Sequence, residues 1–404
     1  MIFNAKLPNN MLGVGLVLAP MVGIITLSLD IYAPSLPNMM RMLSSSQVES
    51  QLTMTAYTLS MGVGQLIFGP LSDRFGRRMS AISALLVYIL GSLYCIVSSS
   101  VESLIIARVI QGLAASAAVV TAYAIIRDRY VGVVAAKGYG FLSSAATLGT
   151  LVGPVVGSLL QDQFHSFRAA FIVLFIFGIV ALLIAVIFVE DTSRFQPRQP
   201  LNFRQVFKNY SLIIRNKSLL GYSVFSTAST ILFFTLTSIS PFILIEQYHV
   251  SQQAYGFYFA SCALMFAMGA FCSTRWVELL GLNRSIILGA SLMLIGALLM
   301  LLSNLYIAKN AVTFILPAWL LFWGVAFCFG PSLAAAMEDF KAMGGAASAV
   351  LACIRYGLGS LLGTFFMSQF ANTAVNFSLF FIVISIGLLG GILNQFRRDK
   401  SSVK

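Results

Sequence analysis

Three charged side chains lie within long apolar stretches of this sequence, namely Asp30, Arg108 and Arg355. From Met11 to Leu29 no residue is charged, so the carboxyl of Asp30 comes near the end of a segment long enough to cross a bilayer. A charged side chain at membrane depth costs about 2.5 to 3.5 kcal/mol on insertion scales. Such residues usually face a bundle interior or a water-filled cavity, where they have partners. The three charges therefore predict a polar site inside the membrane.

Asp30 is the only acid deep in an apolar segment, which makes it the candidate proton carrier. A proton and a cationic substrate could then compete for the same carboxylate. Arg355 departs from a purely cationic picture, because two arginines against one aspartate leave the interior net positive. That balance suggests an anionic or zwitterionic substrate, such as a carboxylate-bearing metabolite or a siderophore. The alternative is a structural role, in which Arg355 caps backbone carbonyls or serves as the counter-charge to lipid or to Glu338.

The elements that must position these charges are membrane-spanning helices. The chain of 404 residues is 58% hydrophobic and 9% charged, against about 25% charged residues in soluble proteins. A spanning helix needs about 20 mostly apolar residues. Twelve stretches qualify, approximately 11 to 32, 52 to 71, 79 to 98, 103 to 126, 137 to 160, 168 to 189, 217 to 245, 252 to 274, 284 to 304, 311 to 337, 343 to 369 and 373 to 396. The first is too long for a signal peptide, so we predict an all-α integral membrane protein.

The longest polar stretch, 190–217, divides these spans six and six. We therefore predict an N-terminal six-helix bundle over 1–189, a linker over 190–217 and a C-terminal six-helix bundle over 218–404. Placing both termini in the cytoplasm puts 20 of the 25 lysines and arginines on the cytoplasmic side, which satisfies the positive-inside rule. This distribution also explains the net charge of +12 without a nucleic-acid partner.

With this orientation, Asp30 and Arg108 lie at similar depth in the outer half of the membrane. We expect a contact between them, direct or through water. The alternative to proton coupling by Asp30 is a static buried ion pair with Arg108 that fixes the helix register. Helical spacing and side-chain polarity add further candidates for the substrate cavity, each with ordinary helix packing as the alternative: Thr26, Tyr57, Met61, Gln111, Thr227, Thr230 and Phe234.

Several sequence motifs indicate which protein family this chain resembles. The loop GPLSDRFGRR (69–78) resembles the loop between the second and third helices of the major facilitator superfamily, G-x-L-x-D-R-x-G-R-R. LIIARVIQG (104–112) resembles its fourth-helix motif, and GTLVGPVVG (149–157) the fifth-helix motif of its antiporters. LDIYAPSLP (29–37) resembles the first-helix pattern of the twelve-helix drug:proton antiporters of the Bcr/CflA type.

The resemblance implies gating roles for two of these motifs. In the family the loop latches the two halves together, and the fifth-helix glycine row lets that helix pack and bend. We expect Gly69 and Pro70 to end the second helix and Gly76 to permit a tight turn. The start of the eleventh helix, 343–348, is the expected partner surface of the loop. The gating residues carried over from the family are Gly69, Asp73, Arg74, Gly76, Arg77, Gly149, Gly153, Pro154 and Gly157.

Other functional classes find little support in the sequence. The only histidines, His165 and His249, fall in outer loops, and no catalytic or nucleotide-binding motif occurs. The five cysteines show no metal-ligand spacing, so neither a metal nor a cofactor is expected. A channel would usually show a charged ring or a filter loop. We therefore predict a monomeric, proton-coupled exporter of small amphipathic molecules in a bacterial inner membrane, with a carrier of an anionic metabolite or siderophore as the alternative.

Overall fold

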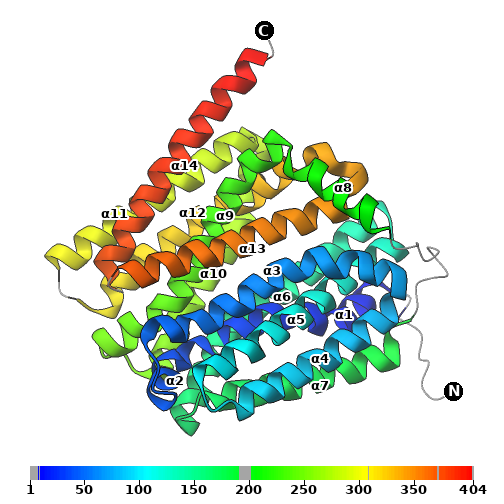
Figure 1. The fold of residues 1–404 in the computed structure, drawn as a ribbon. Coiled ribbons are helices and arrows are strands. Elements are labelled where there is room, and N and C mark those ends of the chain that lie inside the picture. Colours follow the sequence, from blue (N-terminus) through cyan, green and yellow to red (C-terminus); the bar gives the residue numbers. More distant parts are fainter. Residues whose placement is uncertain (1–7, 9, 191–201, 308, 371–372, 403–404) are drawn as a thin grey trace. The chain divides into compact units, whose positions relative to one another are not determined.

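The computed structural model describes residues 8, 10–190, 202–307, 309–370 and 373–402, and these residues form helices joined by turns, without a strand (Figure 1). Lys6 and residues 191–201 of the predicted linker lie outside the described residues. Internal contacts divide the chain into two compact units, Met1–Tyr210 and Ser211–Lys404. The division falls within the predicted linker.

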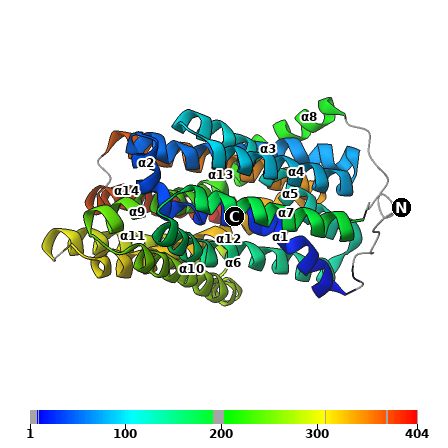
Figure 2. The same ribbon diagram turned by 90° about the horizontal axis from the view of Figure 1, so that it is seen from below.

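The N-terminal unit contains a short helix and six long ones, which run roughly along one direction in both views (Figures 1 and 2). Asn10, Ser46 and Ser100 begin three of them by accepting backbone N–H hydrogen bonds. The helices are α1 (Met11–Asp30), α2 (Leu36–Met42), α3 (Gln47–Phe75), α4 (Arg77–Val97), α5 (Val101–Arg129), α6 (Gly132–Phe164) and α7 (Arg168–Phe188), with a 3₁₀ turn, η1 (Ala33–Ser35), between α1 and α2.

The C-terminal unit contains six long helices, preceded by α8 (Phe203–Ile214), which crosses the boundary between the units. They are α9 (Lys217–Pro241), α10 (Gln252–Leu280), α11 (Leu282–Tyr306), α12 (Ala311–Met337), α13 (Gly344–Gln369) and α14 (Ala374–Ser402). A π-helical turn, η3 (Phe242–Gln247), follows α9, and a 3₁₀ segment, η4 (Glu338–Met343), follows α12.

Eleven helical segments in the described residues are long and apolar enough to cross a membrane. The segment that contains α3 is not among them, although it holds the predicted second span, 52–71. The reason is that α3 carries polar side chains that the protein buries, among them Gln51, Thr53 and Thr58, and it packs closely against α5. A helix whose polar residues face protein does not need a uniformly apolar surface.

The prediction that Gly69 and Pro70 end the second helix is wrong. α3 continues through both residues to Phe75 and stops at Gly76, whose φ of 89° lies in the region that favours glycine. Pro70 lacks an N–H, which leaves the carbonyl of Leu66 without its helical partner. The Tyr210 hydroxyl of α8 donates to that carbonyl at 2.8 Å. A tertiary hydrogen bond therefore replaces the one that proline removes.

Glycine rows bring two helix pairs close together in corresponding places of the two units. A Cβ added to Gly149 or Gly157 of α6 would collide with Thr26 or with the Ile31 carbonyl at the end of α1. A Cβ on Gly363 of α13 would lie 2.9 Å from Phe234 of α9. Thus α6, the fifth predicted span, packs on α1, the first. In the same way α13, the eleventh span, packs on α9, the seventh, as expected for two related halves.

Candidate functional site

Asp30 is the last residue of α1 and is fully buried. The glycine row of α6 covers it, since a Cβ on Gly153 would lie 3.0 Å from the Cβ of Asp30. The hydroxyl of Thr150 approaches the carboxyl from the same helix. Neither carboxyl oxygen has a hydrogen-bond partner in the described part of the chain. A close helix contact therefore encloses a carboxyl that has no fixed donor.

Arg108 on α5 is also fully buried, and aromatic rings surround it. Its guanidinium carbon lies 4.1 Å from the ring centre of Tyr57, 5.1 Å from that of Tyr32 and 5.7 Å from that of Phe171. Ring faces attract a cation, most strongly where water is excluded. These rings, from α3, α7 and the turn after α1, stabilise the buried charge.

Hydrogen bonds fix the orientation of the Arg108 guanidinium. Its Nη1 donates to the Ser28 carbonyl at 3.0 Å and to Oε1 of Gln111 at 2.6 Å. Nη2 has no hydrogen-bond partner among the described residues. Gln111 is held in turn, because its Nε2 donates to Oγ of Ser92 at 2.8 Å.

The expected direct contact between Asp30 and Arg108 is not formed, since no ion pair joins them in the described residues. Arg108 instead binds the backbone of Ser28, two residues before Asp30, and a neutral amide. Ring faces and carbonyl oxygens satisfy a guanidinium without a carboxylate. Both charged groups are therefore buried without an opposite charge within ion-pair distance.

Six residues of this site were not predicted from the sequence: Ser28, Tyr32, Tyr88, Ser92, Thr150 and Phe171. Ser28 and the Tyr88 hydroxyl share a hydrogen bond of 2.6 Å, which joins α1 to α4. Tyr32 belongs to the first-helix motif, so its position in DIYAPSLP was an available signal. Tyr88 and Ser92 lie in an ordinary apolar span, and only the packing of α4 against α5 brings Ser92 to Gln111.

The other predicted cavity residues of the N-terminal unit lie at helix contacts. The Thr26 hydroxyl donates to the Ala146 carbonyl of α6 at 2.7 Å. The Tyr57 hydroxyl donates to the Ile25 carbonyl at 3.1 Å, and Met61 is 2% exposed. Thr26, Tyr57 and Arg108 therefore connect α1 to three neighbouring helices.

In the C-terminal unit, Thr227, Thr230 and Phe234 share a face of α9. Thr230 and Phe234 contact the glycines of α13, and the buried hydroxyl of Thr227 has no partner in the described residues. Arg355 on α13 is partly buried, with its guanidinium carbon 4.9 Å from the ring centre of Phe329 and 4.3 Å from that of Tyr356.

The predicted gating loop forms a charge cluster with the end of α5. Arg77 lies 2.5 Å from Asp73 and 2.7 Å from Asp128, and Arg127 lies 3.4 Å from Asp73. The side chains of Arg77 and Asp128 are 6% and 2% exposed, whereas that of Asp73 is 42% exposed. Arg74 lies over the Phe75 ring at 5.5 Å instead. Asp128 was missed, although it is the only acid in the segment RDR that ends α5.

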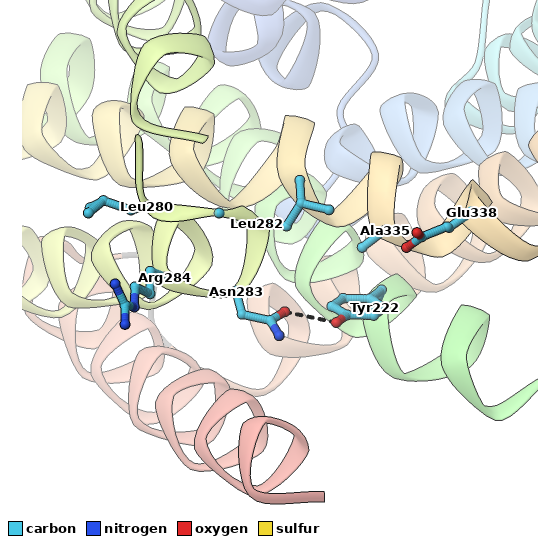
Figure 3. A pocket seen from close by; sticks show the side chains of 8 residues that line it. Tyr222, Leu280, Leu282, Asn283, Arg284, Ala335 and Glu338 are labelled. Carbon is cyan, nitrogen blue, oxygen red and sulfur yellow. Dashed lines mark hydrogen bonds between the residues drawn. The ribbon is translucent and has the colours of Figure 1, made fainter. Parts of the chain in front are cut away.

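A cavity of about 490 Å³ opens at the turn between α10 and α11. Figure 3 shows Tyr222 and Glu338 facing it, with the Tyr222 hydroxyl donating to Oδ1 of Asn283 at 2.8 Å. Its other lining residues are Leu280, Gly281, Leu282, Arg284 and Ala335. None of the predicted site residues lines this cavity.

Comparisons with known proteins agree with this architecture. The chain is 30% identical over 377 residues to the chloramphenicol resistance protein of Pseudomonas aeruginosa, covering 93% of this chain and 88% of that protein. It is 26% identical to the bicyclomycin resistance protein homolog of Haemophilus influenzae, covering 85% of this chain and 86% of that protein. It is also 26% identical to multidrug resistance protein D of Escherichia coli, covering 83% of this chain and 84% of that protein.

Solved transporter structures share the fold at low sequence identity. A POT family transporter in complex with a thioalcohol-conjugated peptide superposes with a TM-score of 0.76 at 12% identity, covering 97% of both chains. The xylose transporter XylE of Escherichia coli gives a TM-score of 0.73 at 14% identity, covering 96% of this chain and 98% of that one. The family model of the Major Facilitator Superfamily matches residues 18–364. The chain therefore belongs to the Major Facilitator Superfamily, and within it to the drug:proton antiporter group, which makes it a multi-pass membrane transporter rather than an enzyme.

Proposed function

We propose that this transporter exports small amphipathic molecules from a bacterial cell in exchange for protons. It acts as a monomer in the inner membrane, with both termini cytoplasmic, by alternating access between two six-helix halves. The names of the relatives, which refer to resistance against chloramphenicol, bicyclomycin and multiple drugs, support export of such molecules. The excess of lysine and arginine on one side supports the orientation.

The environment of Asp30 carries the proposal of proton coupling. Its carboxyl is fully buried beside the neutral hydroxyl of Thr150, and no cation of the described residues forms an ion pair with it. A buried carboxylate without a countercharge is costly, so this group gains by binding a proton or a cationic substrate. Arg108 belongs to the same site, since its Nη1 contacts the Ser28 carbonyl and its Nη2 has no partner in the described residues.

Transport in proteoliposomes with an imposed pH gradient tests this function. Lipophilic cations and polycarboxylates are compared as substrates in wild type, Asp30→Asn and Glu102→Gln. Glu102 is an exposed acid in the first turn of α5 and serves as the control for loss of a carboxylate. We expect gradient-driven accumulation in wild type and Glu102→Gln, and none in Asp30→Asn. Accumulation by folded Asp30→Asn would show that Asp30 is structural.

We propose that the loop cluster around Asp73 and the glycine row of α6 control the conformational change. Asp73 is the most exposed acid of its cluster and pairs with both Arg77 and Arg127, so it is available to a further partner. The row Gly149, Gly153 and Gly157 sits directly on the end of α1 that carries Asp30. Movement of α6 would therefore change the surroundings of the carboxyl.

The alternative substrate class, an anionic metabolite or siderophore, depends on Arg355. Its guanidinium lies close to the rings of Phe329 and Tyr356, which stabilise the charge locally. The rings therefore compensate part of this charge without an anionic substrate, while the buried Nε keeps no hydrogen-bond partner among the described residues. The relatives named above are resistance proteins, which favours the export of drug-like molecules.

A further inference from the structure

Five phenylalanines of the C-terminal unit form a continuous row across three helices. In order they are Phe259 of α10, Phe322 of α12, Phe233 of α9, Phe266 of α10 and Phe329 of α12. The distances between successive ring centres are 6.4, 5.5, 6.4 and 6.2 Å. Each pair meets edge to face, with interplanar angles between 70° and 85°, the geometry that aromatic pairs prefer.

Arg355 stands at one end of this aromatic row. Its guanidinium carbon lies 4.9 Å from the ring centre of Phe329, the last ring, and its Nε is buried without a hydrogen-bond partner among the described residues. The salt bridges in the described part of the chain do not include it. The row therefore ends in a cation that has ring faces beside it and a free donor.

The two ends of the row differ in accessibility. Phe259 and Phe322 are 2% and 0% exposed, whereas Phe233, Phe266, Phe329 and Arg355 are partly exposed. Arg355 lies 11 residues from the first residue of α13, about 16 Å along the helix and so near the middle of a membrane about 30 Å thick. The accessible end therefore offers ring surface and one cation together at mid-membrane depth.

We propose that this end of the row binds the planar aromatic part of a substrate that carries a carboxylate or a comparable acceptor group. This inference rests on the proposed function and names the substrate class that the C-terminal unit recognises. The rings of Phe329 and Phe266 contact the aromatic plane, and Arg355 donates to the acceptor. A guanidinium both stacks on a ring and donates to a carboxylate in its own plane, which an ammonium does not do.

Two neighbouring chemical classes fit this end less well. A saturated anion satisfies Arg355 but loses the edge-to-face and stacking contacts with the rings. An aromatic cation keeps the ring contacts but meets the positive charge of Arg355 in a site of low dielectric, where like charges repel strongly. The aromatic row and Arg355 together therefore favour a substrate that carries both an aromatic ring and an acceptor group.

Calorimetric titration of the purified full-length protein in detergent tests the inference with three probes of similar size. They are 2-naphthoate, its saturated counterpart trans-decahydro-2-naphthoate, and 2-naphthylmethylammonium. We expect wild type to bind 2-naphthoate about tenfold more tightly than either other probe, the effect of one charge-assisted hydrogen bond or one ring contact. Equal affinity for the aromatic and saturated anions would overturn the inference without any variant.

Variants then assign the two parts of the site. Arg355→Gln should weaken 2-naphthoate binding about tenfold, and Phe329→Leu should reduce the preference for the aromatic over the saturated anion. Arg275→Gln, an exposed arginine of α10, is the control and should bind as wild type does. Gel filtration and thermal unfolding confirm the fold of each variant. Unchanged binding in folded Arg355→Gln would overturn the inference.

Binding in detergent needs no gradient, so this experiment separates the inference from the proposed function. The inference stands and proton-coupled export fails if the binding pattern holds while a pH gradient drives no transport. The reverse result, gradient-driven export of 2-naphthoate that is the same in wild type and Arg355→Gln, keeps the function and removes the inference.

Discussion

The Tyr210 hydroxyl of α8 donates a hydrogen bond to the backbone carbonyl of Leu66 in α3 at 2.8 Å. Leu66 is four residues before Pro70, whose missing N–H would otherwise have bonded this carbonyl. The linker helix α8 thus completes the second long helix of the N-terminal unit just before the gating loop. Burial, with the Asp73 carboxylate nearby, raises the pKa of Tyr210 to about 12, so the phenol remains a donor at physiological pH.

Tyr210→Phe should therefore lower the stability of the protein by about 1 kcal/mol, the net value of one hydrogen bond. In a Pro70→Leu background the restored N–H bonds the Leu66 carbonyl, and the same substitution should have little effect. Thermal unfolding in detergent, followed by a dye that reacts with the buried cysteines, measures both. The control is Tyr306→Phe, since Tyr306 is 82% exposed. Equal losses of stability in both backgrounds would contradict the idea that the Tyr210 hydroxyl replaces the hydrogen bond that Pro70 removes.

The contribution of Tyr210 should also depend on pH in a defined direction. A folded-state pKa above the unfolded value, about 10, means that the neutral phenol is favoured in the folded protein. The stability difference between wild type and Tyr210→Phe should be constant up to about pH 10 and fall as the pH rises towards 12. Unfolding midpoints of the two proteins at pH 7, 9 and 11 measure this, and a difference that grows at pH 11 would contradict it.

Asp73 and Asp128 both pair with Arg77, yet their substitutions should act differently. Asp128 is 2% exposed, so Asp128→Asn leaves a buried guanidinium poorly compensated and should cost about 3 to 5 kcal/mol of stability. Asp73 is 42% exposed, so Asp73→Asn should cost at most about 1 kcal/mol while reducing transport. Unfolding midpoints and proteoliposome transport compare the two. Unchanged transport in Asp73→Asn would remove its gating role.

Gly157→Ala should destabilise the N-terminal unit by about 1 to 3 kcal/mol, because the new methyl group would overlap the Ile31 carbonyl. Gly140→Ala on the same helix is the matched control, since a Cβ there meets no atom within 4 Å. That control should be neutral or stabilising by up to about 1 kcal/mol, the helix propensity difference. Similar midpoints for the two variants would show that α6 does not pack on α1 in this way.

Tyr57→Leu should destabilise the protein by about 2 kcal/mol, because it removes the ring closest to the buried Arg108. Tyr57→Phe keeps the ring and loses the hydroxyl's bonds to the Ile24 and Ile25 carbonyls, so it should cost about 1 kcal/mol. Unfolding midpoints of both variants separate the two interactions. A larger loss of stability in Tyr57→Phe than in Tyr57→Leu would indicate that the Tyr57 hydroxyl, and not its ring, stabilises the site.

Much of the architecture was readable from residue types and their order. Composition and segment length identified a helical membrane protein, because apolar runs of this length have one stable form in lipid. The loop 69–78 and the first-helix motif identified the family, since each is a short run of neighbouring residues that form one turn or one helix end. Asp30, Arg108 and Arg355 were singled out because charges at such positions are costly and therefore rare.

The partners of those charges were decided by the tertiary structure. Arg108 lies among Tyr32, Tyr57 and Phe171, which are far apart in sequence, and it does not pair with Asp30 as depth alone had suggested. Tyr210 completes a helix that proline was expected to end, and five phenylalanines form a row only when three helices pack. Depth follows from counting residues along one helix, whereas contact depends on helix rotation and on which neighbours pack against it, and no local pattern encodes either.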